Sequence, residues 1–342
     1  MITPRPSHFG LVDDDFRRNR VVPLAPPTRF QLNLTERCNL RCRHCITDAP
    51  RRTQDGSARD LTPDVLEALR PHLIHADYIG LTHAGEPTIA PLLEPFLEGV
   101  RERRPVVHLV TNGKNLDRER FLRLERLGVC SWSFSVDGLA SHDVLRRGSS
   151  IDRLSSTLSL VSRMRQSTTR MGISCTVTRD NSHELAGLLE LAKELRLDWV
   201  KLEELVPIGG VEGPTNLHEV IDALLAQGDR LGLPVLDHTR PPPFECQLEA
   251  AAEARRSRLD DFVNHAAVNA CRLPYELVCV EPNGDVKPND FHQPPAGNVL
   301  ERSLDEIWRG AGFVLARNRR LLARPCRAGR PTCPSDPGPE AW

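Results

Sequence analysis

Short apolar runs alternate with amphipathic stretches between residues 30 and 205, and this alternation limits the fold more than any other feature. The amphipathic stretches repeat apolar residues at helical spacing, as in 116–128, where the expected apolar stripe consists of Phe121, Leu122, Leu124 and Leu127. Strands that alternate with helices form a parallel α/β sheet, and such sheets bind ligands at the carboxyl ends of their strands. We expect strands at 30–35, 78–85, 106–113, 131–138, 172–178 and 199–205, and helices at 61–75, 91–103, 116–128, 151–166 and 182–196.

A different organisation is expected after residue 205. A glycine-rich loop leads into helical patterns at 216–231 and 247–264. Near residue 270 a small unit begins, in which ELVCVE and DVK, joined by PNG, predict a β-hairpin, and SLDEIW predicts a short helix. We therefore expect an N-terminal arm at 1–28, an α/β core at 29–206, a helical connecting segment at 207–269 and a small C-terminal domain at 270–342.

Charge and hydropathy exclude several classes of protein. The 342 residues carry a formal net charge of −1, which gives no support to binding of nucleic acid or of an anionic membrane surface. The N-terminus has no apolar signal region, and no apolar run is long enough to span a bilayer. We therefore expect a cytoplasmic protein with reduced thiols. The isolated Cys130, Cys175 and Cys246 are expected to be small buried hydrophobes.

Three cysteines, Cys38, Cys42 and Cys45, lie within eight residues directly after the first expected strand. Three thiolates at this spacing can wrap one compact metal centre. Structural zinc sites use four ligands, and iron–sulfur clusters are also held by four thiolates in most proteins. Three thiolates would leave one iron of a cluster open to an exogenous ligand. The alternative is zinc with His44 as fourth ligand, which is crowded because His44 lies between Cys42 and Cys45.

The segment CNLRCRHC resembles the C-x3-C-x-Φ-C signature of the radical S-adenosylmethionine (SAM) superfamily, in which Φ lies against the adenine; His44 stands at that position. The resemblance covers about residues 29–205 and 270–333. It implies a partial (β/α)6 barrel similar to a TIM barrel, and a [4Fe–4S] cluster on Cys38, Cys42 and Cys45 whose fourth iron binds SAM. Reduction by a flavodoxin or ferredoxin-type partner would then cleave SAM to methionine and a 5′-deoxyadenosyl radical.

Other segments at strand ends resemble family motifs that line the SAM site. HAGEPT is similar to the family's G-G-E-P motif, which implies that Gly85 and Glu86 hold the SAM amino group, although Ala84 replaces the first glycine. Taken singly, these segments are also compatible with ordinary turns and solvated charges. The resemblance further implies cofactor contacts from Asn112, Ser135 and Asp137, from Arg146 or Arg147, and a ribose or substrate contact from Glu203 or Glu204.

The C-terminal part resembles the SPASM/twitch extension of radical SAM enzymes, which carries an auxiliary iron–sulfur cluster. The family's G-x-V-x-P-C ends here in Asn289, so one usual ligand is missing unless Cys279 or Asp290 substitutes. Two outcomes stay open. The domain holds a second [4Fe–4S] cluster, or the cluster is lost or altered. In the second case the domain serves only for packing, or one of its thiols donates a hydrogen atom to a substrate radical. The expected auxiliary ligands are Cys271, Cys279, Cys326 and Cys333.

The expected substrate is a small sugar-like natural product, such as an aminoglycoside, an aminocyclitol or a nucleoside sugar. The reason is that residues 1–28 are too short for the leader-recognition domain of peptide-modifying relatives. The substrate radical would be oxidised, epimerised, dehydrated or decarboxylated, in antibiotic biosynthesis. Two alternatives remain: a peptide-modifying radical SAM enzyme with a separate leader-binding protein, and a non-catalytic zinc-binding protein.

Overall fold

The computed structural model describes residues 9–239, 273–288 and 291–321. Its internal contacts divide the chain into two compact units. Unit 1 comprises residues 1–32, 62–79 and 241–336, and unit 2 comprises residues 33–61, 80–240 and 337–342. The boundaries expected at residues 28, 206 and 269 follow the sequence pattern rather than this division, and they stay predictions.

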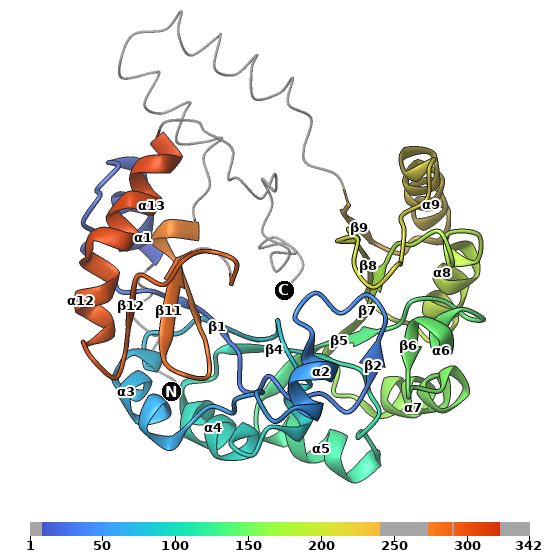
Figure 1. The fold of residues 1–342 in the computed structure, drawn as a ribbon, viewed down its shortest axis with the longest axis horizontal. Helices are drawn as coiled ribbons and strands as arrows, with labels where there is room; N and C mark the ends of the chain where they lie inside the picture. Colours follow the sequence, from blue (N-terminus) through green and yellow to red (C-terminus); the bar gives the residue numbers. More distant parts are fainter. Residues whose placement is uncertain (1–8, 240–272, 289–290, 322–342) are drawn as a thin grey trace, which may run out of the picture. The chain divides into compact units, whose positions relative to one another are not determined.

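Unit 2 is built on parallel strands that alternate with helices, as the sequence predicts. Its strands lie in the order β4-β5-β7-β8-β9, each parallel to its neighbour. Figure 1 shows the intervening helices α5, α7, α8 and α9 lying along these strands. The bounds are β4 (Val106–Thr111), α5 (Arg118–Arg126), β5 (Val129–Ser135), α7 (Ile151–Met164), β7 (Arg170–Thr176), α8 (Leu185–Glu194), β8 (Trp199–Glu203), α9 (Leu217–Leu231) and β9 (Val235–His238).

Strand β9 corrects one prediction, because it lies inside the segment 207–269 that was expected to be helical. The helix expected at 216–231 is present as α9, and the helical pattern at 247–264 lies outside the described residues. Strand β9 has only four residues, all of intermediate burial, and VLDH carries no strong alternation of apolar and polar residues. Pairing with β8, rather than local pattern, therefore makes this segment a strand.

The two faces of strand β5 show how the core of unit 2 forms. Trp132 and Phe134 are fully buried, and the ring of Trp132 lies 5.0 Å from that of Phe121 on α5. Because side chains alternate along a strand, Ser131 and Ser133 project to the opposite face, where both are also buried. Burial of each aromatic ring contributes about 1.5–3 kcal/mol. The helix-covered face is thus apolar, and the other face is polar.

The remaining elements of unit 2 are short. Several expected strands end earlier than the sequence pattern predicted. For example, β5 ends at Ser135, and residues 136–138 are not part of the strand. These elements are β2 (Arg41–Cys42), α2 (Ala49–Gln54), η1 (Pro87–Ile89), α4 (Leu93–Val100), η2 (Arg101–Arg103), α6 (His142–Leu145) and β6 (Arg146–Arg147).

Unit 1 contains the predicted C-terminal hairpin. Strands β10 and β11 pair antiparallel, β10 also lies parallel to β1, and β11 pairs with β12. The predicted short helix is α12, which begins with a capping box between Ser303 and Glu306. The elements of unit 1 are α1 (Phe9–Arg17), β1 (Arg29–Leu32), α3 (Pro63–Leu73), η3 (Leu273–Tyr275), β10 (Leu277–Val280), β11 (Asp285–Pro288), β12 (Gly297–Asn298), α12 (Leu304–Arg309) and α13 (Ala311–Leu321), while β3 (Tyr78–Leu81) crosses the division.

The described N-terminal residues, from residue 9 onward, pack into unit 1. The indole of Trp308 donates a hydrogen bond of 2.9 Å to the carbonyl of Ala25. Phe16 meets Tyr275 edge to face at 5.8 Å. Arg317 is fully buried 4.3 Å from the ring of Trp308, and burial lowers its pKa to about 10.

Across the described residues, no helix is both long and apolar enough to cross a bilayer.

Candidate active site

The loop 36–48 of unit 2 carries the three clustered cysteines. Cys38, Cys42 and Cys45 are free thiols of intermediate burial. The backbone N–H of Cys38 donates to the hydroxyl of Thr53 at 3.0 Å, and the N–H of Leu40 points at the Cys38 sulfur at 3.5 Å. Backbone contacts therefore fix this loop at the positions of the thiols.

The environment of two of these thiols, Cys38 and Cys42, disfavours their ionisation. Burial raises the pKa of Cys38 to about 12, in spite of the N–H of Leu40. Burial also raises the pKa of Cys42, against the effect of Arg146. Thiols of this kind become thiolates when a metal binds them. In the described part of the chain, no group of three His, Cys, Asp or Glu side chains is placed to hold a single metal ion.

Glu36 anchors the loop, and the sequence analysis did not identify it. Its carboxylate is buried and accepts bonds from the backbone N–H of Arg59 at 2.8 Å and from the guanidinium groups of Arg59 and Arg52. Burial alone would raise the pKa of Glu36, but these donors lower it to about 2. No motif marks this position, since its partners follow by 16 and 23 residues.

Gly85 and Glu86 lie beside the cysteine loop. Gly85 has a φ of +65°, and a Cβ atom there would lie 2.3 Å from the carbonyl oxygen of Thr35 and 2.5 Å from that of Arg37. Only glycine fits such a position. The N–H of Glu86 donates to the carbonyl of Arg37 at 2.8 Å. Backbone contact thus joins this motif to the segment that leads into Cys38.

The carboxylate of Glu86 is buried and is held by neutral donors alone. It accepts from the N–H and hydroxyl of Thr88 at 3.0 and 2.7 Å, from the hydroxyl of Thr111 at 2.8 Å, and from the N–H of Asn112 at 2.7 Å. Burial raises its pKa above the ordinary carboxyl range. A buried carboxylate with neutral donors around it is a suitable partner for an ammonium group.

Asn112 connects the end of β4 to the cysteine loop. Its amide nitrogen donates to the side-chain oxygen of Asn39 at 2.8 Å and lies 4.0 Å from the sulfur of Cys38. Lys114 reaches the carbonyl of Asn39 at 3.2 Å. The structure therefore brings Cys38, Glu86 and Asn112 together, as the motifs predicted.

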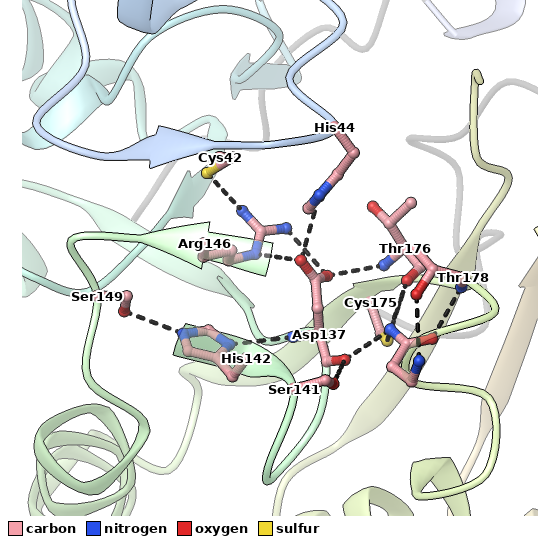
Figure 2. Close-up of polar contacts among 11 residues, drawn as sticks. Cys42, His44, Asp137, Ser141, His142, Arg146, Ser149, Cys175, Thr176 and Thr178 are labelled. Atoms are coloured by element: carbon pink, nitrogen blue, oxygen red, sulfur yellow. Dashed lines mark hydrogen bonds and ion pairs between the residues drawn. The ribbon is translucent and has the colours of Figure 1, made fainter. Parts of the chain in front are cut away.

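Asp137 is the centre of a second buried network, shown in Figure 2. Its carboxylate pairs with Arg146 at 2.6 and 3.1 Å and with Nε2 of His44 at 3.1 Å, and it accepts the N–H of Thr176 at 3.0 Å. Burial opposes its ionisation, but Arg146 and His44 hold the pKa of Asp137 well below its usual range. The Arg146 guanidinium also lies 4.0 Å from the sulfur of Cys42.

Register decides between the two arginines that the sequence left open. Strands β2 and β6 pair antiparallel, with Cys42 opposite Arg146 and Arg41 opposite Arg147. The side chain of Arg146 is 14% exposed and engaged with Asp137, whereas Arg147 is exposed. Arg146 therefore belongs to the site, and Arg147 faces solvent.

The polar face of the parallel strands carries residues that sequence reasoning missed. The ring of His108 meets the hydroxyl of Ser131 at 2.8 Å, and Ser133 meets Ser174 at 2.9 Å. The register also places Ser135, of intermediate burial, opposite Ser174. The serines at 131, 133 and 135 follow the two-residue period of a strand, and this was the signal for a polar face.

Glu203 ends strand β8 on the same kind of polar face. Its carboxylate pairs with Lys201 at 2.5 Å and lies 3.8 Å from Nδ1 of His238 on β9. Glu204 is exposed, so only Glu203 is half-buried in the strand. Lys201 lies two residues before Glu203, and alternation along the strand would have predicted this pair.

The C-terminal cysteines are described only in part. Cys279 is buried in β10, where it packs with Leu277 and Phe291. The other expected ligands and the two residues that bear on the altered motif lie outside the described residues, so the ligand set stays a prediction. These residues are Cys271, Cys326, Cys333, Asn289 and Asp290.

The residues of unit 2 fit the cofactors that the motifs imply. A cluster fits three half-buried thiols without a fourth protein ligand. The buried carboxylate of Glu86 fits the ammonium group of SAM. Nδ1 of His44 is also buried and has no hydrogen-bond partner among the described residues, so a group of the ligand can pair with it. An orphaned buried acceptor or donor costs about 1–3 kcal/mol, which a ligand group would offset.

Comparison with known proteins agrees with this fit. The model of the radical SAM superfamily matches residues 32–192, and that of an iron–sulfur cluster-binding (SPASM) domain matches residues 271–334. Fe-coproporphyrin III synthase of Methanosarcina barkeri is 24% identical over 318 residues, 85% of this chain and 77% of its own. Mycofactocin maturase MftC of Mycobacterium ulcerans is 24% identical over 320 residues, 90% of this chain and 79% of its own.

A solved structure shares the fold. Streptococcus suis SuiB, crystallised with S-adenosylmethionine, superposes with a TM-score of 0.65 at 15% identity, covering 85% of this chain and 68% of its own. The predicted fold class is thereby confirmed. The two family matches also confirm the predicted [4Fe–4S] cluster and SAM, and they imply further iron–sulfur clusters in the C-terminal domain. The chain belongs to the radical SAM superfamily and carries a C-terminal SPASM domain.

Proposed function

We propose that this protein is a radical SAM enzyme that modifies a peptide, by removing a hydrogen atom from a carbon of one of its residues. Similarity to a maturase over 90% of the chain carries this proposal. The sugar-like substrate expected from the shortness of residues 1–28 has no such support. The peptide alternative therefore replaces it as the leading hypothesis.

The polar face of the parallel strands supports a peptide substrate. Backbone amides need both donors and acceptors, and Ser133, Ser174, Lys201 and Glu203 offer both on neighbouring strands. The Lys201–Glu203 pair is 12% and 23% exposed, so its charges are partly desolvated and can select polar groups of a substrate.

The bound cluster and SAM together supply a carbon-centred radical able to take an unactivated hydrogen atom. The chain's own residues provide the binding and orientation. Cys38, Cys42 and Cys45 would hold the cluster, and Glu86 would bind the ammonium group of SAM. Burial of His44 and Glu86, at 7% and 2% exposure, keeps water from this side of the site.

The proposal is tested by anaerobic reconstitution with iron, sulfide and SAM, followed by incubation with three substrate classes. These are precursor peptides encoded near the gene, coproporphyrin and an aminoglycoside. We expect formation of 5′-deoxyadenosine together with a mass change in a peptide. A mass change confined to the tetrapyrrole would assign the chain to the activity named for its heme-precursor relative, and one confined to the aminoglycoside would restore the sugar hypothesis.

Variants on the polar face refine this test. Lys201→Met and Glu203→Gln should each lower peptide modification at least tenfold, while deoxyadenosine formation without substrate stays unchanged. Lys193→Met is the matched control, because Lys193 is an exposed lysine on α8 in the same unit. Cys38→Ala should abolish SAM cleavage altogether. Equal peptide turnover in the Lys201 and Lys193 variants would remove the polar face from the substrate site.

A further inference from the structure

The segment 37–52, which carries the three cysteines, contains five arginines, and four of them pair with carboxylates of the fold. These pairs are Arg37–Asp60, Arg43–Asp180, Arg51–Asp48 and Arg52–Glu36. The fifth, Arg41, is exposed and forms no ion pair within the described part of the chain. Its charge therefore stabilises nothing that the fold provides.

The residue that faces Arg41 is another unpaired arginine. Strands β2 and β6 place Arg41 directly opposite Arg147, which is also exposed and has no carboxylate partner among the described residues. Side chains directly opposite each other share one face of the ladder, and like charges in such a pair destabilise it. The next pair of the ladder, Cys42 and Arg146, projects to the other face, toward Asp137 (Figure 2).

A third cation lies beside this pair. The ammonium group of Lys114 donates to the carbonyl of Asn39 at 3.2 Å and would lie 3.7 Å from a Cβ atom at Gly148, the residue after Arg147. Lys114 likewise has no carboxylate partner in the residues that the structure describes. We call Arg41, Lys114 and Arg147 the basic face. Because the whole chain carries a net charge of −1, the basic face is a local concentration of positive charge.

We propose that the basic face is the docking surface for an acidic electron-carrier protein, which delivers one electron to the cluster held by Cys38, Cys42 and Cys45. The carrier loses one electron and the cluster gains it, and no atom is transferred. A partner that covers Arg41 lies next to Cys42 in the chain, so docking here brings the carrier close to a cluster ligand. Charge complementarity of this kind speeds and orients encounter between proteins. The inference rests on membership of the superfamily, goes beyond the proposed function and is independent of the peptide substrate.

Binding provides the first test. The cluster-loaded protein is mixed with an acidic ferredoxin, and the association rate and Kd are measured at several salt concentrations. We expect the double variant Arg41→Gln/Arg147→Gln to associate about tenfold more slowly at low salt. The difference should disappear near 1 M salt, where the Debye length is about 3 Å.

Arg163→Gln is the matched control for this measurement. Arg163 is exposed in the last turn of α7 in the same unit and forms no ion pair with any described residue. Its variant should keep the wild-type rate and salt dependence. An Arg41→Gln/Arg147→Gln protein that associates as fast as Arg163→Gln at low salt would overturn the proposal.

The choice of reductant separates docking from damage to the site. Stopped-flow spectroscopy follows cluster reduction by reduced ferredoxin and by reduced methyl viologen, a small cation that needs no acidic docking surface. We expect the double variant to be slowed about tenfold with ferredoxin and to match the wild type with methyl viologen. Equal slowing with both reductants contradicts the proposal. Peptide modification that falls equally with both reductants would assign the arginines to the substrate instead.

Arg147→Glu separates docking from stability. This substitution turns the like-charge pair with Arg41 into an opposite-charge pair, which is favourable across a ladder. The midpoint of urea unfolding should therefore stay unchanged or rise, while association with ferredoxin slows more than in Arg147→Gln. Wild-type association in a folded Arg147→Glu protein would refute the docking surface. If Arg147→Glu fails to fold, the glutamine variants still decide the question.

Discussion

Glu86→Gln tests the contact on which SAM binding depends. In the protein, one oxygen of Glu86 accepts three hydrogen bonds from Thr88 and Thr111, and the other accepts the N–H of Asn112 at 2.7 Å. That second oxygen keeps lone-pair capacity for an ammonium group. Glutamine has the same shape, but its NH2 group must face one of these donors, and its charge is lost.

The magnitude follows from the number of bonds and the burial. Loss of one charge-assisted hydrogen bond costs about 1.5–3 kcal/mol. We therefore expect Glu86→Gln to weaken SAM binding about 10- to 150-fold. The unfolding free energy of the cluster-free protein should fall by less, because burial already raises the pKa of Glu86 and so disfavours its charged form.

The pH dependence gives a second signature. A raised pKa means that the carboxyl takes up a proton at a pH above its ordinary value, and only the ionised form pairs with an ammonium group. Wild-type SAM affinity should therefore fall as the pH drops through this raised pKa, while that of Glu86→Gln stays flat, so that the two converge at low pH.

Calorimetric titration of the cluster-loaded protein with SAM measures the affinity, and urea unfolding of the cluster-free protein measures stability. Glu94→Gln is the control, because Glu94 lies on a helix of the same unit and forms a partly exposed ion pair with Arg123. If Glu86→Gln folds normally and binds SAM within threefold of the wild type, the carboxylate does not hold the ammonium group.

Three further predictions follow from the geometry of the site. Arg146→Gln should lower the midpoint potential of the cluster, because the guanidinium that it removes lies 4.0 Å from the Cys42 sulfur. The expected decrease is on the order of 60 mV, one tenfold step of a one-electron couple. Arg146→Lys should restore part of this potential, as measured by an EPR-monitored redox titration. Gly85→Ala should lower the free energy of unfolding, measured in urea, by about 3 kcal/mol or more, since the added Cβ would meet two carbonyl oxygens. Gly56→Ala is the control, because Gly56 has a φ of +76° in open space, and it should lower the free energy of unfolding by about 1 kcal/mol. Glu36→Gln should lower the free energy of unfolding by about 2 kcal/mol at neutral pH, after allowance for the 46% exposure of Arg59. This difference from the wild type should vanish as the pH falls from about 4.5 to about 2, because the pKa of Glu36 is depressed in the folded state. An unchanged difference over that range would refute the assignment.

The sequence by itself determined the chemistry that local spacing can encode. Three thiols within eight residues predict a metal centre whatever the surrounding fold, because neighbours along a chain stay neighbours in space. Apolar periodicity likewise located the strands and helices of the α/β core, and the β-hairpin and helix of the C-terminal part. The turn glycine and carboxylate of HAGEPT were recognisable for the same reason, since a tight turn depends on consecutive residues.

Only the tertiary structure decided which distant residues act together. Register in the β2–β6 pair chose Arg146 over Arg147, and Asp137 reaches His44 and Thr176 across 93 and 39 residues of chain. Strand β9 exists because β8 offers it a partner, and Glu36 gains its role only when Arg52 and Arg59 fold back onto it. Such contacts depend on packing between elements, and the periodicity of any single element carries no record of its neighbours.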